Sequence, residues 1–317
     1  MKYYDLVIDN KSKATDTMYT YCSEEELDIG QKVYVSFARS KNLKEAYVFR
    51  KSDTYDGEHR LKSIDHIDPD ICLTEEMVKA CEWMRGRYLV KYIDAVHCFI
   101  PPGQPPKREL KERKKVEASD APKVLTDEQK HAYEQIALSI DDNKSDIYLI
   151  HGVTSSGKTE VYMQAIARAI EQGKTAIMMV PEVALTNEII NRFEKRFGSD
   201  AVAIMHYKLT KPQRYLQWQK IRKGEVKIVI GARSAVFAPL DNIGVIIMDE
   251  EHESSYKSDM TPKYDTIDVA VKRAKAFDGT VVLGSATPSV VSMHRAKTGI
   301  YRLISLTRRY NNNPLPD

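Results

Sequence analysis

The sequence predicts an α/β fold in which a small β-rich domain precedes a doubly wound parallel sheet. Short aromatic and β-branched segments fill the N-terminal part, whereas continuous apolar runs alternate with helical patterns after residue 146. Between them, four of the thirteen prolines fall within six positions and precede a charged run, which indicates a linker. We therefore expect a β-rich domain at residues 1–105, a linker at 106–123 and an α/β domain at 124–317.

The composition is typical of a chain that forms packed domains, with 42% hydrophobic residues in a length that suits roughly two domains. A net charge of +3 is too small to indicate a nucleic-acid binder by itself. The four cysteines form no CxxC pair, which argues against a structural zinc site and a disulfide framework. Because no apolar run approaches the ~20 residues of a membrane span and no signal-peptide pattern opens the chain, we expect a cytoplasmic protein.

The β-rich domain is predicted from four short segments separated by Asp, Asn, Gly and Ser turns. They are YYDLVID, MYTYCS, QKVYVSFA and EAYVFR, a series that is typical of a small barrel or sandwich. Residues 73–96 instead have apolar side chains at helical spacing, with Thr74 as an N-cap. We predict a helix there, and its apolar stripe is expected to belong to the core.

The second domain is predicted from six apolar runs, IYLI, TAIMMV, AVAIM, KIVI, VIIM and TVVLG. Such runs suit strands that are buried on both faces of a parallel sheet. Helical patterns lie between them at 159–172, 186–197 and 212–223, and each is followed by a glycine, the usual C-terminal signal. This alternation predicts a doubly wound domain.

A phosphate-binding motif follows the run IYLI. Residues 152–159, GVTSSGKT, fit GxxxxGK[ST] and open a helical pattern, so the motif lies in the strand-to-helix setting that it requires. In such a P-loop, backbone N–H groups wrap a phosphate, the lysine reaches the β- and γ-phosphates and the hydroxyl ligates Mg²⁺. The predicted nucleotide-binding residues are Gly152, Ser155, Ser156, Gly157, Lys158 and Thr159.

Acidic residues follow the apolar run at 245–248 and complete the sequence DEEH at 249–252. We expect Asp249 to hold Mg²⁺ through water and Glu250 to polarise the attacking water. Alone, an acidic cluster after a strand is a common turn, but the upstream P-loop favours a metal carboxylate. The candidate catalytic residues are Lys158, Asp249, Glu250 and His252, and the candidate metal ligands are Thr159 and Asp249.

Three further polar segments follow apolar runs, at the edge where doubly wound sheets bind ligands. They are VPEVALT at 180–186, GARSA at 231–235 and GSATPS at 284–289. Small hydroxyl residues and one arginine suit contacts to a nucleic-acid backbone, although each segment alone also fits an ordinary turn. The candidate nucleic-acid contacts are Arg233, Ser234, Ser285 and Thr287.

Together these motifs resemble those of the DExH helicases of superfamily 2, and within them the bacterial replication-restart helicases. GVTSSGKTEVY, VPEVALT, IVIGARSAVFAP, IIMDEEHESSYK and VVLGSATPS carry the resemblance in this order. The resemblance implies a RecA-like P-loop domain that binds ATP and Mg²⁺. The family also has LTxEQ ahead of the P-loop, here LTDEQ at 125–129, which implies that Gln129 contacts the adenine edge.

The β-rich domain resembles the same family, in which a small β domain captures a free 3′ DNA end. The family patterns F-[DT]-Y and GxxVxVPFG correspond to residues 19–21 and 30–38. The resemblance implies DNA contacts by Tyr19, Thr20 and Ala38, with the Tyr19 ring stacked on a terminal base. Alternatively, Tyr19 and Phe37 are ordinary core residues of a barrel.

The sequence also departs from the family pattern. Ser155 stands where the family usually has glycine, and Ala38 replaces the last glycine of the second barrel pattern. The chain ends before the cysteine-rich zinc insertion and the second RecA-like lobe of the family. Zinc is therefore expected for the full-length family, but its ligands are absent here.

The resemblance implies an ATP-dependent 3′-to-5′ DNA helicase of replication restart, of which this chain holds the DNA-end-binding domain and the first motor lobe. The implied partners are forked DNA, free 3′ ends, single-stranded DNA, and primosome and single-strand-binding proteins. The implied location is the cytoplasm, in association with the nucleoid. Two alternatives stay open. One is a non-catalytic DNA-binding or scaffold fragment that binds ATP without unwinding DNA, and the other is a different P-loop motor, such as a restriction or repair translocase.

Overall fold

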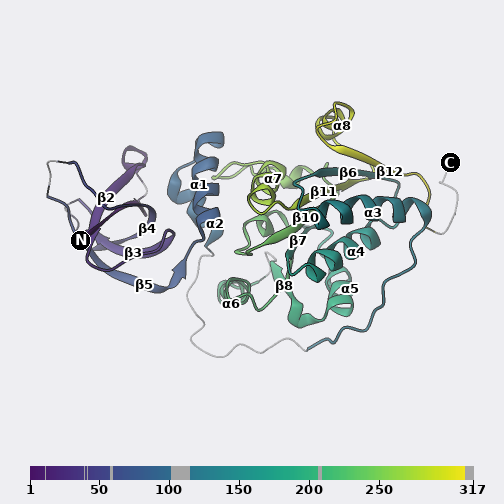
Figure 1. Ribbon diagram of the computed structural model, residues 1–317, viewed down its shortest axis with the longest axis horizontal. Coiled ribbons are helices and arrows are strands. Elements are labelled where there is room, and N and C mark those ends of the chain that lie inside the picture. The colour runs from purple at the N-terminus through teal and green to yellow at the C-terminus, as the bar shows by residue number, and fades with distance from the viewer. Residues whose placement is uncertain are drawn as a thin grey trace. The chain divides into compact units, whose positions relative to one another are not determined.

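The computed structural model describes residues 1–10, 12–38, 40, 42–57, 60–100, 115–205 and 209–310 (Figure 1). The chain divides into two compact units, Met1–Ile100 with Asp259–Tyr264, and Pro101–Ser258 with Asp265–Asp317. The first unit holds an antiparallel β-sheet and the second a parallel sheet with helices, which confirms the predicted fold class. Among the helices of these residues, none has the length and apolar character that a membrane span requires.

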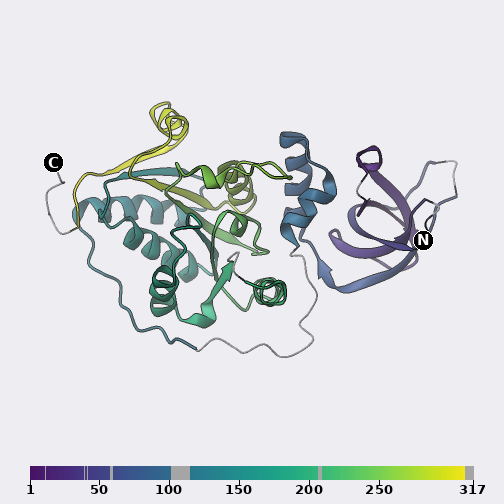
Figure 2. The ribbon, with the colours of Figure 1, turned by 180° about the vertical axis from the view of Figure 1, so that it is seen from behind.

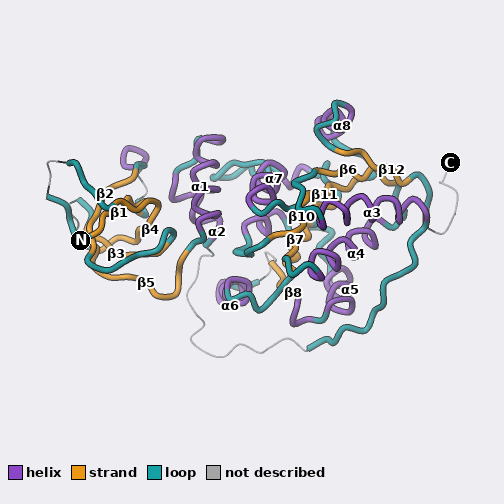
Figure 3. Tube along the Cα trace, in the orientation of Figure 1, coloured by secondary structure: helices purple, strands orange, loops and turns teal. Residues whose placement is uncertain are grey.

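The first unit is built on a five-stranded antiparallel sheet with the order β2-β1-β4-β3-β5 (Figure 3). The elements are β1 (Lys2–Ile8), η1 (Lys13–Thr15), β2 (Met18–Ser23), β3 (Gln31–Ser36), β4 (Leu43–Ser52) and β5 (Ile64–Cys72). An isolated bridge joins Cys22 to Ser63, and Cys22 N donates to Lys62 O at 3.1 Å. The sheet edges therefore meet and form a partly closed barrel.

Alternating side chains from β1, β3 and β4 fill the barrel, because successive residues of a strand point to opposite faces. Leu6, Val33 and Val48 are fully buried in this cluster. Gly30 allows the chain to turn into β3, since its φ is 87° and a Cβ there would lie 2.0 Å from Leu73 O. Only glycine fits this approach.

Two helices follow the barrel, so the prediction of one continuous helix at residues 73–96 is wrong. Thr74 caps α1 (Glu75–Tyr88) as predicted, but Leu89 adopts a left-handed φ of 55° and ends the helix. The second helix, α2 (Tyr92–Phe99), begins where Asp16 Oδ1 accepts a hydrogen bond from Tyr92 N at 3.0 Å. A residue far away in the sequence therefore caps α2, and no glycine or proline marks the break.

The second unit is a seven-stranded parallel sheet with the order β12-β6-β11-β10-β7-β9-β8 (Figures 1 and 2). Its strands are β6 (Ile147–Gly152), β7 (Thr175–Met179), β8 (Val202–Met205), β9 (Ile228–Gly231), β10 (Ile243–Asp249), β11 (Thr280–Ser285) and β12 (Arg302–Leu306). The six predicted runs correspond to β6 through β11.

Helices precede and connect these strands. They are α3 (Asp127–Asp141), α4 (Lys158–Glu171), α5 (Asn187–Phe197), α6 (Lys211–Arg222), α7 (Thr266–Ala276) and α8 (Val290–Lys297), with the 3₁₀ segments η2 (Ser199–Ala201), η3 (Arg233–Phe237) and η4 (Ser254–Tyr256). The predicted helices are α4, α5 and α6. Positive φ angles of 72°, 82° and 70° at Gly173, Gly198 and Gly224 confirm the predicted glycine ends.

Both faces of the parallel sheet are buried. On one face, α3, α4 and α5 pack Ile136, Val161 and Phe193 into the same apolar cluster as strand residues such as Ile150 and Ile247. The intervening strand residues point to the other face and are also fully buried, among them Ile177, Val229, Ile246 and Leu283. This two-sided burial explains why the strands are continuous apolar runs in the sequence.

The described part of the predicted linker, residues 115–123, runs along the second unit. Ser119 N and Asp120 N donate to Lys195 O at 2.7 and 3.0 Å, and Val116 N donates to Ser199 Oγ at 3.0 Å. These bonds attach the segment to the end of α5 and to η2. The earlier part of the linker, through residue 114, lies outside the described residues.

Candidate functional site

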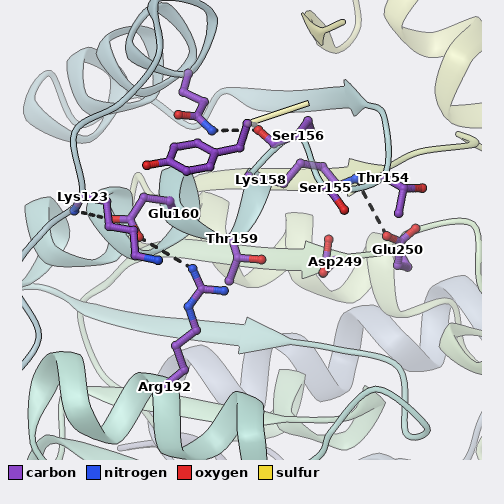
Figure 4. A pocket seen from close by; sticks show the side chains of 13 residues that line it. Lys123, Thr154, Ser155, Ser156, Lys158, Thr159, Glu160, Arg192, Asp249 and Glu250 are labelled. Carbon is purple, nitrogen blue, oxygen red and sulfur yellow. Dashed lines mark hydrogen bonds and ion pairs between the residues drawn. The ribbon is translucent and has the colours of Figure 1, made fainter. Parts of the chain in front are cut away.

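A cavity of about 290 Å³ lies at the carboxyl edge of the parallel sheet, where β6 and β10 end (Figure 4). It is lined by Lys123, Gln129, Thr154, Ser155, Ser156, Gly157, Lys158, Thr159, Glu160, Arg192, Asp249, Glu250 and Tyr310. The P-loop segment and the first two residues of DEEH therefore face the same space.

The P-loop segment joins β6 to α4 by a tight turn. Gly157 caps α4 with a φ of 80°, and a Cβ at Gly152 would lie 2.8 Å from Ser156 Oγ and 3.2 Å from Lys158 Cγ. Lys158 is buried, and its Nζ donates to Gly152 O at 2.8 Å. Since Gly157, Lys158 and Thr159 all line the cavity, the N-terminus of α4 and the ammonium group both favour a bound anion there.

Two serines of the P-loop have unusual environments. Ser155 has a φ of 64°, in the left-handed region that costs a non-glycine residue roughly 1–2 kcal/mol. Its carbonyl oxygen accepts a hydrogen bond from Tyr310 N at 3.0 Å. Ser156 Oγ is buried and has no hydrogen-bond partner among the residues that the structure describes. Because buried hydroxyls normally have a partner, this hydroxyl is available to donate a hydrogen bond to a bound oxyanion.

The end of β10 brings two carboxylates to the cavity. Asp249 closes the strand, Glu250 follows with a φ of 47°, and Lys158 Nζ lies 3.9 Å from Glu250 Oε1. Burial and, after it, repulsion from Glu250 raise the pKa of Asp249 above its ordinary value. A cation next to this pair would offset the cost of the buried negative charge.

The predicted metal ligands, Thr159 and Asp249, line this cavity together. A hydroxyl and a carboxylate are hard oxygen donors, and Mg²⁺ is usually bound by one or two protein oxygens together with substrate phosphates and water. The donor set therefore fits Mg²⁺ that is bound with a nucleotide. Within residues 1–100, 115–205 and 209–310, apart from the few gaps given above, no cluster of three or more His, Cys, Asp or Glu side chains forms a metal site.

Gln129, which is predicted to contact adenine, lies against the P-loop with 1% of its surface exposed. Its Nε2 donates to Ser156 O at 2.7 Å, and its Oε1 accepts from Thr126 N at 2.9 Å in the capping box of α3. Gly157 leaves room for this amide, because a Cβ there would lie 2.2 Å from Nε2. Both ends of the amide are thus bonded within the protein, and its contact with adenine stays a prediction.

His252 and Ser285 connect the ends of β10 and β11. His252 Nδ1 lies 2.7 Å from Ser285 Oγ and 3.5 Å from Glu250 Oε2. Ser285 is fully buried, and its hydroxyl also accepts a hydrogen bond from Thr287 N at 2.9 Å. The predicted DNA contact by Ser285 therefore has no exposed surface through which to act in this structure. Its hydroxyl instead links the DEEH and GSATPS segments.

The other predicted contacts of the second unit lie in loops. Ser234 and Thr287 are exposed, and Arg233 is half-buried. Arg233 Nη1 donates to the carbonyl oxygens of Ser255 and Lys257 at 3.2 and 2.8 Å, which fixes this side chain against the loop that follows DEEH. Nucleic-acid contacts by Arg233, Ser234 and Thr287 stay predictions.

In the first unit, Tyr19 is half-buried and its ring centroid lies 5.0 Å from that of Phe37, edge to face. Both rings pack against the barrel core, and Tyr19 keeps some exposed surface, so its contact with a DNA base stays a prediction. Thr20 Oγ1 donates to Asp5 Oδ1 at 2.7 Å, and Ala38 is exposed with a φ of 53°.

Five cavity residues, Lys123, Thr154, Glu160, Arg192 and Tyr310, lie outside the set predicted from the sequence. Buried Glu160 accepts hydrogen bonds from Lys123 N at 3.1 Å and from Arg196 Nη2 at 3.0 and 3.1 Å. Arg192 Nη2 lies 3.8 Å from the same carboxylate. The sequence signal for this ion-pair group is Glu160, an acidic residue within the helical pattern at 159–172. Acidic side chains are rarely buried without a partner.

Two buried tyrosines that hold Asp249 were also missed. Tyr162 Oη donates to Asp249 Oδ1 at 3.1 Å, and Tyr256 Oη donates to the Asp249 main-chain oxygen at 2.8 Å. In the sequence both are indistinguishable from ordinary core aromatics, because only the fold brings them to the end of β10.

Comparison with known families agrees with this geometry. Residues 126–295 match the model of the DEAD/DEAH box helicase family, and residues 6–101 match that of a 3′DNA-binding domain (3′BD). Since the first match covers more than half of the chain, the chain belongs to the DEAD/DEAH box helicase family. Within that family it corresponds to the N-terminal portion of the replication restart protein PriA.

Two relatives illustrate the correspondence. Replication restart protein PriA of Bacillus subtilis is 50% identical over 196 residues, which are 62% of this chain and 24% of that protein. PriA of Rickettsia prowazekii is 36% identical over 308 residues, 96% of this chain and 46% of that protein. The chain thus spans less than half the length of these relatives. Among solved structures, RecG bound to a three-way DNA junction aligns with a TM-score of 0.45 at 24% identity, covering 62% of this chain and 25% of that one.

Proposed function

We propose that this chain supplies the DNA-end-binding domain and the first motor lobe of an ATP-dependent 3′-to-5′ DNA helicase that acts in replication restart. The observation that carries the proposal is the cavity in which the P-loop, Asp249 and Glu250 face one another. The family of the second unit supports ATP as the ligand, and the match of residues 6–101 supports a 3′ DNA end as the ligand of the first.

In this proposal each cavity residue has one task. Lys158 and the free N–H groups at the start of α4 bind the β- and γ-phosphates, and Thr159 and Asp249 hold the metal ion. Bound Mg²⁺ neutralises charge that develops on the phosphates. Glu250 orients the attacking water, and His252, through its contact with Ser285, connects this end of the cavity to the GSATPS segment.

The first unit binds a free 3′ end through Tyr19, Thr20 and Ala38, while Arg233, Ser234 and Thr287 of the second contact single-stranded DNA. Primosome and single-strand-binding proteins are the expected partners, at stalled forks in the bacterial cytoplasm.

Calorimetric titration with MgADP tests the nucleotide site. Lys158→Ala should lose most of the affinity, because it removes the buried ammonium that meets the phosphates. Lys130→Ala is the matched control, since this lysine lies on α3 with 66% of its side chain exposed and outside the cavity. Equal affinities of the wild type and Lys158→Ala would show that the phosphate-binding assignment is wrong.

Turnover tests whether this chain alone supplies every group that ATP hydrolysis needs. In related P-loop enzymes an arginine finger is worth about 10³ to 10⁵ in rate. In the part of the chain that the structure describes, the arginine that lines the cavity is Arg192, which lies beside Glu160. We therefore expect the 317-residue chain to bind nucleotide, hydrolyse it slowly and unwind nothing. Robust DNA-stimulated hydrolysis that Glu250→Gln abolishes would contradict this expectation.

A further inference from the structure

A buried tyrosine contacts the carboxylate at the end of β10. Tyr162 is fully buried, and its Oη donates a hydrogen bond of 3.1 Å to Asp249 Oδ1. It lies on α4 four residues after Lys158, so both residues share one side of the helix. One side of α4 thus provides the ammonium of the phosphate site and a hydrogen bond to the predicted metal ligand.

Gly284 makes this contact possible. It is paired with Asp249 in the register of β10 and β11, directly beside the carboxylate. A Cβ at Gly284 would lie 1.6 Å from Tyr162 Oη and 3.4 Å from Asp249 Oδ1. The position must therefore lack a side chain for the phenol to reach the carboxylate. Gly284, the first residue of GSATPS, therefore contributes to the predicted metal site. From the sequence alone it is only the end of a strand.

The phenol acts as a neutral donor. A tyrosine hydroxyl carries its proton at neutral pH, because its ordinary pKa is about 10. A carboxylate has two oxygens, and this contact occupies one position on Oδ1. Oδ2 is not part of this contact, and the hydrogen bond restricts the rotation of the carboxylate plane.

We propose that Tyr162 is a positioning residue for the divalent metal ion, because its hydroxyl holds the Asp249 carboxylate in the orientation that receives Mg²⁺ bound with a nucleotide. The inference rests on the proposed function. Tyr162 is not among the residues that line the cavity, so it acts through Asp249 and not on the nucleotide. Removing an outer partner of this kind typically lowers metal affinity by 10- to 100-fold, in rough terms.

The experiment measures how ADP binding to the 317-residue chain depends on Mg²⁺. Tyr162→Phe removes one oxygen atom and keeps the ring. ADP affinity in excess EDTA should equal that of the wild type, whereas the Mg²⁺ concentration that gives half of the metal-dependent gain in affinity should rise roughly 10- to 100-fold. Gly284→Ala should have the same effect, because it keeps the tyrosine hydroxyl but displaces it from Asp249.

Tyr148→Phe is the matched control. It also removes a fully buried hydroxyl, one whose partners are Ser139 Oγ at 2.7 Å, Gln135 O at 2.9 Å and Arg302 Nη1 at 3.3 Å, so it reports the loss of buried hydrogen bonds away from the site. Its Mg²⁺ dependence should match that of the wild type.

The outcomes are distinct. Wild-type Mg²⁺ dependence in Tyr162→Phe would overturn the inference, as would a loss of ADP affinity that is equal with and without Mg²⁺, which indicates a structural role alone. If Tyr162→Phe does not fold, Gly284→Ala decides by the same two criteria. A wild-type chain that binds no nucleotide would overturn the proposed function itself, and a wild type that binds ADP with no effect of Mg²⁺ would overturn only the metal assignment and this inference.

Discussion

The ammonium group of Lys158 lies between two oxygens of the protein, donating to Gly152 O at 2.8 Å and lying 3.9 Å from Glu250 Oε1. The γ-phosphate of a bound nucleotide brings negative charge to the same group. Glu250 therefore has two opposing effects on binding, since it holds the lysine in the cavity and also repels the phosphates. Because the two effects have opposite signs, they partly cancel when the charge of Glu250 is removed.

Glu250→Gln should accordingly leave MgADP affinity within about fivefold of the wild type, since a partly exposed charge pair is worth ~0–1 kcal/mol. Fluorescence titration with a labelled ADP measures this. Glu253→Gln, a neighbour with 43% of its side chain exposed, controls for the loss of one negative charge. A large loss of affinity confined to Glu250→Gln would show that Glu250 binds the nucleotide complex and does not merely orient water.

The buried carboxyl of Asp249 makes stability depend on pH. Burial and the neighbouring Glu250 raise its folded pKa above the unfolded value, so at neutral pH its charge destabilises the metal-free fold. This cost is present in full above the raised pKa and disappears as the pH falls from that pKa to the unfolded value, below which both states bind the proton. Asp249→Asn removes the charge and retains an oxygen that can accept from Tyr162.

Asp249→Asn should therefore raise the midpoint of thermal unfolding at neutral pH in EDTA, by about 2–4 °C for each kcal/mol of stability regained. The gain should shrink as the pH is lowered through the Asp249 pKa. Asp241→Asn, with 60% of its side chain exposed, should show neither effect. A gain that persists unchanged at acidic pH would show that the buried charge is not its cause.

The fold was predictable from the sequence where strands are buried on both faces of the sheet and where glycines mark the helix ends. Strands β6 to β11 are continuous apolar runs, and glycines end α4, α5 and α6. The strands that were missed, β5 and β12, lie at sheet edges. Edge strands need little apolar surface: β5 has the polar sequence IDHIDPDIC, and β12 leaves Leu303 44% exposed. Helix α3 was missed because its capping residues were interpreted only as part of a nucleotide motif.

The candidate site was predictable to the extent that its chemistry is local in the sequence. The P-loop and DEEH each follow one strand, and parallel strands bring their carboxyl ends to the same edge. Tyr162 and Arg192 carry no such signal, because they resemble ordinary helix residues until packing places them beside Asp249 and Glu160. The bonded amide of Gln129 likewise depends on how α3 packs against the P-loop.

The half-buried ring of Tyr19 predicts a specific defect in DNA binding. If this ring stacks on a terminal base, Tyr19→Ala should weaken binding of DNA with a free 3′ end by about 5- to 150-fold, from the ~1–3 kcal/mol of one stacked base. The preference for free over blocked 3′ ends should disappear with it. Fluorescence anisotropy with two DNA ligands, one with a free and one with a blocked 3′ end, measures both the affinity and the preference.

Tyr3→Ala controls for the loss of an aromatic pair in the same unit, because the Tyr3 and Tyr55 rings lie 5.7 Å apart, much as Tyr19 and Phe37 do at 5.0 Å. A Tyr19→Ala chain that is less stable but still distinguishes free from blocked ends would assign Tyr19 to the barrel core alone.

The two ends of the cavity differ in chemistry, and this predicts which part of the nucleotide each end contacts. Glu250 and the Lys158 ammonium lie at one end, and Lys123 and Glu160 lie at the other, beyond Thr159 (Figure 4). In a P-loop, the lysine contacts the β- and γ-phosphates. When Lys158 and Thr159 hold these phosphates, we expect the ribose and base to extend towards the second end. Arg192 reaches it from α5, with 37% of its side chain exposed.

Arg192→Ala should therefore weaken MgADP binding by about 5- to 30-fold, as expected for the loss of ~1–2 kcal/mol of stacking or hydrogen bonding by a guanidinium. Its affinity for Mg²⁺-tripolyphosphate, which has neither ribose nor base, should stay at the wild-type value, whereas Lys158→Ala should lose both ligands. Lys195→Ala removes a positive charge from the exposed side of the same helix and should change neither. Because a general electrostatic effect weakens both ligands alike, an equal loss of ADP and tripolyphosphate in Arg192→Ala would place this arginine among the phosphate contacts and refute its assignment to the ribose and base.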